Sequence, residues 1–351
     1  TEVSNVTFPY PSLLSLARFA GATLNSYQRF AVPALTPVLL NLCLIGAALW
    51  GAPNVEEPVV ALALGVLVAG FAQLLFQVPA LAGVGLVPRP RWAPRHEGVR
   101  RIMLLMVPAL FGVSVSQINL LLDTVLASLL PTGSVSWLYY SDRLTELPLG
   151  VFAIAIATVI LPTLSGQRAR ADDPAFSSTL AWAIRCVLLI AIPATVALAI
   201  LSEPLLATLF QYGAFSEGDR TMAAASLRAY TLGLGAFMLV KVLAPGFYAR
   251  EDMRTPVRIG IIAMVANMLL NAAFVFPLMW WLNLGHVGLA LATSVSAWLN
   301  AMLLYRGLRR GAVLPADSLP LKWLLQILLA TAAMIGALAW MLPENAVWAD
   351  W

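Results

Sequence analysis

Three ionisable side chains, Asp142, Arg143 and Glu146, lie close together near the start of a long apolar stretch. On a helix, Arg143 and Glu146 are three residues apart and Asp142 and Glu146 are four apart, so the three share one face and can pair. A guanidinium binds phosphate through two parallel hydrogen bonds, which makes Arg143 the candidate ligand for an anion. The alternative is a structural ion pair that fixes how the helices pack.

Other polar residues fall within apolar stretches but are weaker signals one by one. Interhelical hydrogen bonding, or a long side chain reaching toward water, explains each of them singly. Taken together, the acids and bases are more than packing requires. The candidate binding set is Arg143, Glu146, Asp142, Lys241, Gln117 and Asp123; Arg18, Asn119 and Asn271 are the remaining polar residues of this kind.

The composition places these residues in a membrane protein. Of 351 residues, 60% are hydrophobic and 11% are charged, whereas soluble domains carry about 25% charged residues. A soluble enzyme, a secreted disulfide scaffold and a disordered tail are therefore excluded. At about 20 residues per crossing, the length suits roughly ten transmembrane helices. The expected spans are 8–27, 33–51, 58–82, 102–129, 137–163, 183–210, 225–248, 259–282, 286–305 and 321–342.

The position of the charged run within its span constrains where these side chains can point. Trp137, Tyr139 and Tyr140 are expected to form an aromatic belt at the outer interface. At roughly 1.5 Å per residue from Trp137, Arg143 is about 9 Å and Glu146 about 14 Å deep. An ionisable residue at the centre of a spanning helix costs about 2.5–3.5 kcal/mol. These side chains must therefore face the helix bundle or a water-filled cavity.

Several kinds of chemistry have no motif here. The two cysteines, Cys43 and Cys186, lie in apolar runs and are read as small buried hydrophobic residues. The two histidines, His96 and His286, are far apart, and no cluster has metal-ligand spacing, so neither a metal nor a cofactor is expected. A phosphate-binding G-x-x-x-x-G-K-[ST] loop is absent. The basic balance, with a pI near 9.3, is read as membrane topology and not as nucleic-acid binding.

The charges of the loops alternate along the chain. By the positive-inside rule the loops rich in arginine are cytoplasmic and those poor in it are external. The cytoplasmic loops then contain Arg29, Arg95, Arg168, Arg254 and Arg309, and the external loops contain Glu57, Glu217 and Asp350. For the densest basic loop, residues 86–101, a patch that binds anionic lipid is the alternative to a topology signal.

A short internal repeat suggests two halves. Tyr27-Gln28-Arg29 precedes Thr36-Pro37-Val38, and Tyr248-Ala249-Arg250 precedes Thr255-Pro256-Val257 six spans later, although matches this short also arise by chance. An even separation implies parallel halves, of which the first lacks three spans, so the chain is expected to be a fragment. The expected organisation is 1–85 (end of the first lobe), 86–101 (cytoplasmic linker), 102–305 (second lobe) and 306–351 (a loop and an additional helix).

Four stretches resemble the MurJ (MviN) family of lipid II flippases, in the multidrug/oligosaccharidyl-lipid/polysaccharide exporter superfamily. They are Asn25 to Ala34, Trp137 to Pro148, Leu209 to Gly213, and Lys241 to Val257. The resemblance implies an all-α polytopic protein of fourteen helices, of which this chain resembles helices four to thirteen. It implies two six-helix lobes, related by an axis along the membrane normal, around a cavity that opens to each side in turn.

The resemblance also implies a function and a site. The substrate would be lipid II, the undecaprenyl-pyrophosphate-linked peptidoglycan precursor, exported across the bacterial inner membrane for cell-wall synthesis. In the family, basic residues on the first, second and eighth helices line the cavity. The last of these falls on Arg143, with Asp142 and Glu146 in the same motif, and the others would precede Thr1. Lys241 matches a lysine before Ala-Pro-Gly, whereas Arg18 matches no family arginine. The implied partners are lipid II, membrane lipids and the cell-wall synthesis machinery.

No covalent chemistry is expected, so the protein is not predicted to be an enzyme. A cation-coupled drug antiporter of the same superfamily is the main alternative, but a cationic substrate would favour an acidic cavity. A second alternative is an exporter of a different polyprenyl-linked glycan, which charge alone does not separate from a lipid II flippase. A scaffold without transport activity is a third, although it would leave the intramembrane charges without a purpose.

Overall fold

A computed structural model describes residues 6–27, 29–55, 57–86, 96–314 and 320–341, and the described residues form helices and turns without strands. The chain divides into two compact units, Thr1–Arg100 and Arg101–Trp351, each of which is described by itself. Most of the predicted linker 86–101, together with Gln28, Arg95 and Asp350, lies outside the described residues. The predicted domain boundaries therefore stay a prediction.

The described residues of the first unit form a bundle of three long helices. Helix α2 covers Tyr10–Ser26, and α3 covers Ala31–Gly46 and continues through a π-helical turn, Ala47–Gly51, and a 3-10 turn, Ala52–Asn54. Helix α4, Pro58–Gly83, packs against both α2 and α3. Two glutamines on α4, Gln73 and Gln77, are buried in this bundle, and Gln73 Nε2 donates to the Thr36 carbonyl at 3.3 Å.

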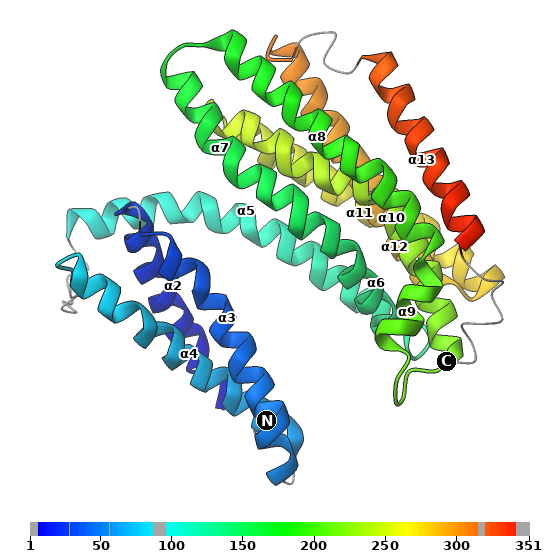
Figure 1. The fold of residues 1–351 in the computed structure, drawn as a ribbon, viewed down its shortest axis with the longest axis horizontal. Helices are drawn as coiled ribbons and strands as arrows, with labels where there is room; N and C mark the ends of the chain where they lie inside the picture. Colours follow the sequence, from blue (N-terminus) through cyan, green and yellow to red (C-terminus); the bar gives the residue numbers. More distant parts are fainter. Residues whose placement is uncertain (1–5, 28, 56, 87–95, 315–319, 342–351) are drawn as a thin grey trace. The chain divides into compact units, whose positions relative to one another are not determined.

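The second unit is built around α10, and α5 leads into it (Figure 1). Seventeen residues of α10 are buried, against eleven of α12, so α10 is the central helix among those whose side chains are described. It packs against α6, α7, α8, α9 and α12, while α11 packs along α12 and α13 lies against α8. The helices are α5 Glu97–Ser128, α6 Ser134–Pro148, α7 Ile154–Ala169, α8 Asp173–Ile200, α9 Ser202–Phe210, α10 Glu217–Tyr248, α11 Arg254–Leu282, α12 Gly285–Arg310 and α13 Leu321–Met341.

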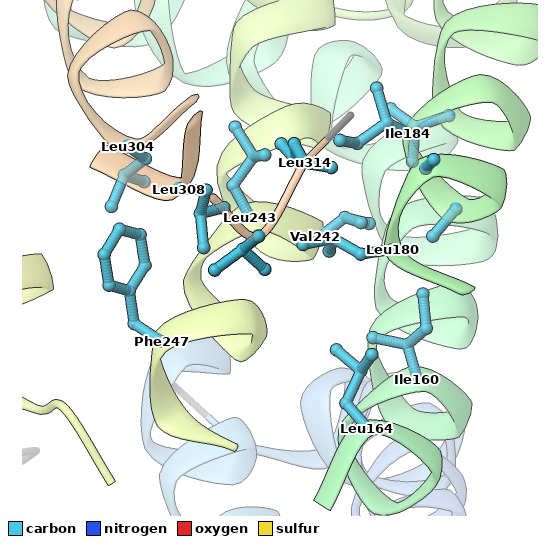
Figure 2. Close-up of a cluster of buried hydrophobic side chains, with 14 of the residues drawn as sticks. Ile160, Leu164, Leu180, Ile184, Val242, Leu243, Phe247, Leu304, Leu308 and Leu314 are labelled. Carbon is cyan, nitrogen blue, oxygen red and sulfur yellow. The ribbon is translucent and has the colours of Figure 1, made fainter. Parts of the chain in front are cut away.

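An apolar cluster holds four of these helices together at the ends where α7, α10 and α12 finish. Figure 2 shows side chains from α7, α8, α10 and α12, and from the residues that follow α12, pointing toward one another. Leu164, Leu180 and Leu308 are fully buried in it. In water, burying a leucine stabilises a fold by about 1.5–3 kcal/mol through the hydrophobic effect. In a membrane, van der Waals contacts between closely packed side chains stabilise the helix bundle instead. This cluster fixes the ends of α10 and α12 that bound the cavity described below.

The predicted spans correspond to helices, with one error in their limits. In the described part of the chain, eight helices are long and apolar enough to cross a membrane, with α6 and α7 counted as one continuous helix. The predicted spans 8–27 and 102–129 correspond to two further helices, α2 and α5, which are not among these eight. The span predicted over 183–210 is wrong, because α8 runs from Asp173 to Ile200 and α9 is a separate helix. Pro204 has no N–H to donate to the Ile200 carbonyl, which weakens the helix at this point. Pro193 lies within α8 without ending it, so a proline alone does not decide where a helix stops.

The orientation of α10 gives a direct test of the topology. In a variant lacking Cys43 and Cys186, a cysteine that replaces Glu217 should react with a membrane-impermeant thiol reagent in intact cells. A cysteine that replaces Arg254 should react only after the cells are opened. Both positions are exposed in the structure, so access is decided by the membrane and not by burial. Labelling of the Arg254 position in intact cells would show that the predicted orientation is wrong.

Candidate functional site

The charged run lies on α6 and places two of its three ionisable residues on an exposed face. Arg143 Nη1 donates to Glu146 Oε2 at 2.7 Å, and the two side chains are 53% and 49% exposed. This confirms the predicted pairing of Arg143 with Glu146. Since both side chains are half accessible, the guanidinium keeps N–H groups that another acceptor can reach.

An aromatic ring completes the surroundings of Arg143. The guanidinium carbon lies 4.8 Å from the centre of the Tyr139 ring, within the range of a cation–π interaction. Tyr139, Arg143 and Glu146 thus follow one another on successive turns of α6. After Pro148 the helix widens into a π-helical turn, Leu149–Ala153, before α7 begins. Such turns often occur near functional sites in helices.

The second unit contains a cavity of about 770 Å³, next to this face. Its charged lining residues are Asp142, Glu146 and Lys241, which come from α6 and α10. Among the described residues Lys241 forms no ion pair, and its side chain is exposed. The uncharged polar lining comes from five helices and consists of Asn119, Thr145, Tyr230, Tyr248, Asn267, Thr293, Ser296 and Asn300. The cavity can therefore hold a strongly polar group.

A network of side-chain amides closes one wall of the cavity. Asn271 Nδ2 donates to Asp123 Oδ1 at 2.7 Å, and Asn119 Nδ2 donates to Asp123 Oδ2 at 3.1 Å. Asn271 Nδ2 also donates to Asn267 Oδ1. Asn267 Nδ2 in turn donates to Thr293 Oγ1 and to Ser296 Oγ, each at 3.4 Å. Asp123 thus joins α5 to α11, and Asn267 extends the network from α11 to α12. The sequence pointed to Asp123 and Asn271 separately and missed that they bind each other.

The six predicted site residues therefore occupy different places. Asp142, Glu146 and Lys241 line the cavity, Arg143 lies beside it on the exposed face of α6, and Asp123 lies in the amide network. Gln117 is exposed on α5, and Arg18, which was not in the predicted set, is exposed in the first unit. Arg185, in the middle of α8, is an intramembrane charge that the sequence reading missed, although a search of apolar runs for single charges would have found it.

The expected aromatic belt stays a prediction, and two of its three members also contact other helices. Trp137 Nε1 donates to Asp219 Oδ1 at 2.7 Å, and its ring lies 4.9 Å from that of His286. Tyr140 packs against Phe210 and Phe215. Trp137 contacts α10 because Asp219, which also caps the start of α10 with Ser216, offers an acceptor there, and its ring meets His286 on α12. Tyr140 joins α6 to α9 through Phe210. Tyr139, at 54% exposed, is the member that remains on the surface.

The motif from Lys241 to Val257 forms the corner between α10 and α11. Tyr248 lines the cavity, and Glu251 takes a left-handed conformation, with φ of 60°, that ends α10. Asp252 Oδ1 accepts from the Thr255 N–H at 3.0 Å, and hydrogen bonds from Thr255 hold the pKa of Asp252 below its ordinary value. This corner places the ends of α10 and α11 beside the cavity.

The fold and site define a class: a polytopic α-helical membrane protein whose spanning helices enclose charged and amide side chains. A family model described as "Lipid II flippase MurJ" matches residues 1–349. The chain belongs to the MurJ family and is a multi-pass protein of the inner membrane.

Two relatives agree with this assignment. A Vibrio cholerae protein, "Probable lipid II flippase MurJ", is 50% identical over 346 residues, which are 99% of this chain and 65% of that protein. A Haemophilus influenzae protein of the same description is 49% identical over 350 residues, 98% of this chain and 67% of that protein. The chain thus spans about two thirds of the length of these relatives.

Solved structures share the fold. "Lipid II flippase MurJ, inward closed conformation" matches with a TM-score of 0.78 and 26% identity over 99% of this chain and 69% of that one. An outward-facing multidrug resistance MATE transporter of the MOP superfamily matches with a TM-score of 0.66 and 16% identity, over 89% of this chain and 69% of that one. The second likeness concerns the fold alone.

Proposed function

We propose that residues 1–351 form part of a flippase that moves lipid II from the inner to the outer leaflet by alternating access. The match of residues 1–349 to lipid II flippases carries this proposal. The physical task is to carry a pyrophosphate-linked glycopeptide across about 30 Å of hydrocarbon while its prenyl tail stays in lipid. No bond is made or broken in this task, so the protein acts as a transporter and not as an enzyme.

In this proposal Arg143 binds the pyrophosphate. It is half exposed, and a guanidinium can bind phosphate oxygens through two N–H groups at once. Glu146 orients it through the 2.7 Å ion pair at Nη1, which leaves the other N–H groups of the guanidinium for the anion. This arrangement replaces the hydration of the pyrophosphate without burying an unpaired charge in the empty protein.

The remaining predicted residues take supporting roles. Asp142 and Lys241 line the cavity and bind polar groups of the glycopeptide, for which a free ammonium group is suited. Asp123 holds α5 against α11, and so keeps the wall of the cavity in place. Gln117 is exposed on α5 and is a weaker candidate for contact with the substrate.

We also propose the larger architecture. Two six-helix lobes and fourteen helices are consistent with a chain that covers 65% of a relative and divides near Arg100. Cell-wall synthesis enzymes would then consume the exported lipid. An inside-negative membrane potential favours outward movement of an anion by about 2.3 kcal/mol per charge per 100 mV, which is one available source of energy.

A cation-coupled drug antiporter is the second candidate, because the MATE transporter shares the fold. The charges that line the cavity, Asp142 and Glu146 against Lys241, do not separate the two candidates. The half-exposed guanidinium of Arg143 beside the cavity and the family match favour an anionic, lipid-linked substrate. An exporter of another polyprenyl-linked glycan has the same electrostatic requirements as a lipid II flippase and is separated from it by the family match alone.

Depletion of the native flippase tests the proposal. The full-length protein should restore growth and should restore lipid II to the outer leaflet, where an added enzyme that cannot cross the membrane cleaves it. Drug efflux without lipid II export would favour the antiporter. Accumulation of a different polyprenyl-linked glycan outside would favour the other exporter.

A further inference from the structure

Tyr139 lies on the same exposed face of α6 as Arg143 and Glu146, one turn before Arg143. Its ring centre is 4.8 Å from the guanidinium carbon, while Glu146 holds Nη1 at 2.7 Å from the other side along the helix. The guanidinium is therefore restrained at two places by residues of its own helix. Neither contact depends on another helix, so both persist when other helices move.

The two restraints act on different parts of the guanidinium. An aromatic ring attracts a cation toward its face, and a carboxylate accepts from N–H groups at the edge. Together they fix both the position and the rotation of the plane. Two parallel hydrogen bonds to a phosphate require such a fixed plane, and a mobile arginine must first be ordered, at a cost in conformational entropy.

Another exposed tyrosine shows that this contact is not a general property of aromatic residues here. Tyr212, which follows α9, is 71% exposed, and its hydroxyl donates to the Thr208 carbonyl at 2.8 Å. Its ring contacts no cation among the described residues. Tyr212 is therefore a matched control for exposed aromatic surface without a cation–π contact.

We propose that Tyr139 is a positioning residue that orients Arg143 for the pyrophosphate of the lipid-linked substrate. The inference rests on the proposed function, because it assumes that Arg143 binds that anion. The ring acts through the guanidinium and makes no contact of its own with the phosphate. The aromatic face supplies the cation–π contact on which the inference rests.

Binding of lipid II to the purified full-length protein in lipid nanodiscs tests this. Tyr139→Leu should weaken binding about two- to thirtyfold, the range expected from loss of a cation–π interaction. Tyr139→Phe and Tyr139→Trp should bind more tightly than Tyr139→Leu, since both keep the ring. Tyr212→Leu should bind as the wild type does. If Tyr139→Leu lowers the melting temperature, Tyr139→Gln replaces it as the variant without a ring.

A double-mutant cycle separates positioning from direct contact. In an Arg143→Ala background, Tyr139→Leu should cause no further loss. An additional, independent loss would show that Tyr139 acts without Arg143 and would overturn the inference. Wild-type binding by Tyr139→Leu, with loss in Arg143→Ala, would overturn it too and leave the proposed function intact. Wild-type binding by Arg143→Ala would instead refute the anion site itself.

Discussion

Arg143→Ala is expected to abolish export of lipid II in the full-length protein while the amount of protein in the membrane stays near normal. The side chain is 53% exposed and its ion-pair partner is the neighbouring Glu146, so removal leaves no buried charge. An ion pair exposed to this degree contributes at most about 1 kcal/mol to stability. Arg143→Lys should restore export only in part, because an ammonium lacks the planar pair of donors. Outer-leaflet lipid II and protein abundance are measured together.

A second exposed ion pair provides the control. Arg168 and Asp173 pair at 3.1 Å with side chains 49% and 77% exposed, away from the cavity that Asp142 and Lys241 line. Arg168→Ala should therefore leave export unchanged. Normal export by a well-expressed Arg143→Ala protein would refute the assignment of the site. Loss of export in proportion to loss of protein would favour a structural ion pair.

The charged face of α6 could be predicted because it is local. The spacing of Arg143 and Glu146 on a helix determines that they can meet, and the ion pair forms as expected. Their chemical role came from the resemblance of residues 137–148 to a family motif and stays a prediction. The helices could be predicted from the long apolar runs for the same reason, since a run of about 20 apolar residues is local and spans a membrane as a helix.

The cavity could not be predicted, because its walls come from helices far apart in the sequence. Asn271 and Asp123, which hydrogen-bond at 2.7 Å, are separated by 148 residues. A single polar residue in an apolar run looks the same whether it faces lipid, a neighbouring helix or a cavity. Trp137 illustrates this, since its position indicated an interface belt and only the location of Asp219 reveals its partner.

Gly288→Ala is expected to destabilise the second unit by about 1–3 kcal/mol, the usual cost of adding volume to a tightly packed site. A Cβ at Gly288 would lie 2.9 Å from the carbonyl carbon and oxygen of Phe274 and from the Cα of Val275. These are backbone atoms of α11 and cannot turn aside, so α11 and α12 must separate. Separation would also strain the contacts of Asn267 with Thr293 across the same pair of helices. The measurement is the melting temperature of the purified full-length protein.

A glycine in open space is the matched control for this change. A Cβ at Gly166, on α7, would meet no atom within 4 Å. Gly166→Ala should therefore keep or raise the melting temperature, because alanine stabilises a helix by roughly 0.5–1 kcal/mol relative to glycine. Equal melting temperatures for Gly288→Ala, Gly166→Ala and the wild type would contradict this prediction. They would mean that the backbones of α11 and α12 lie further apart than the contact between Gly288 and Phe274 indicates. The amide wall of the cavity would then need a different explanation, since the same approach brings Asn267 to Thr293 and Ser296.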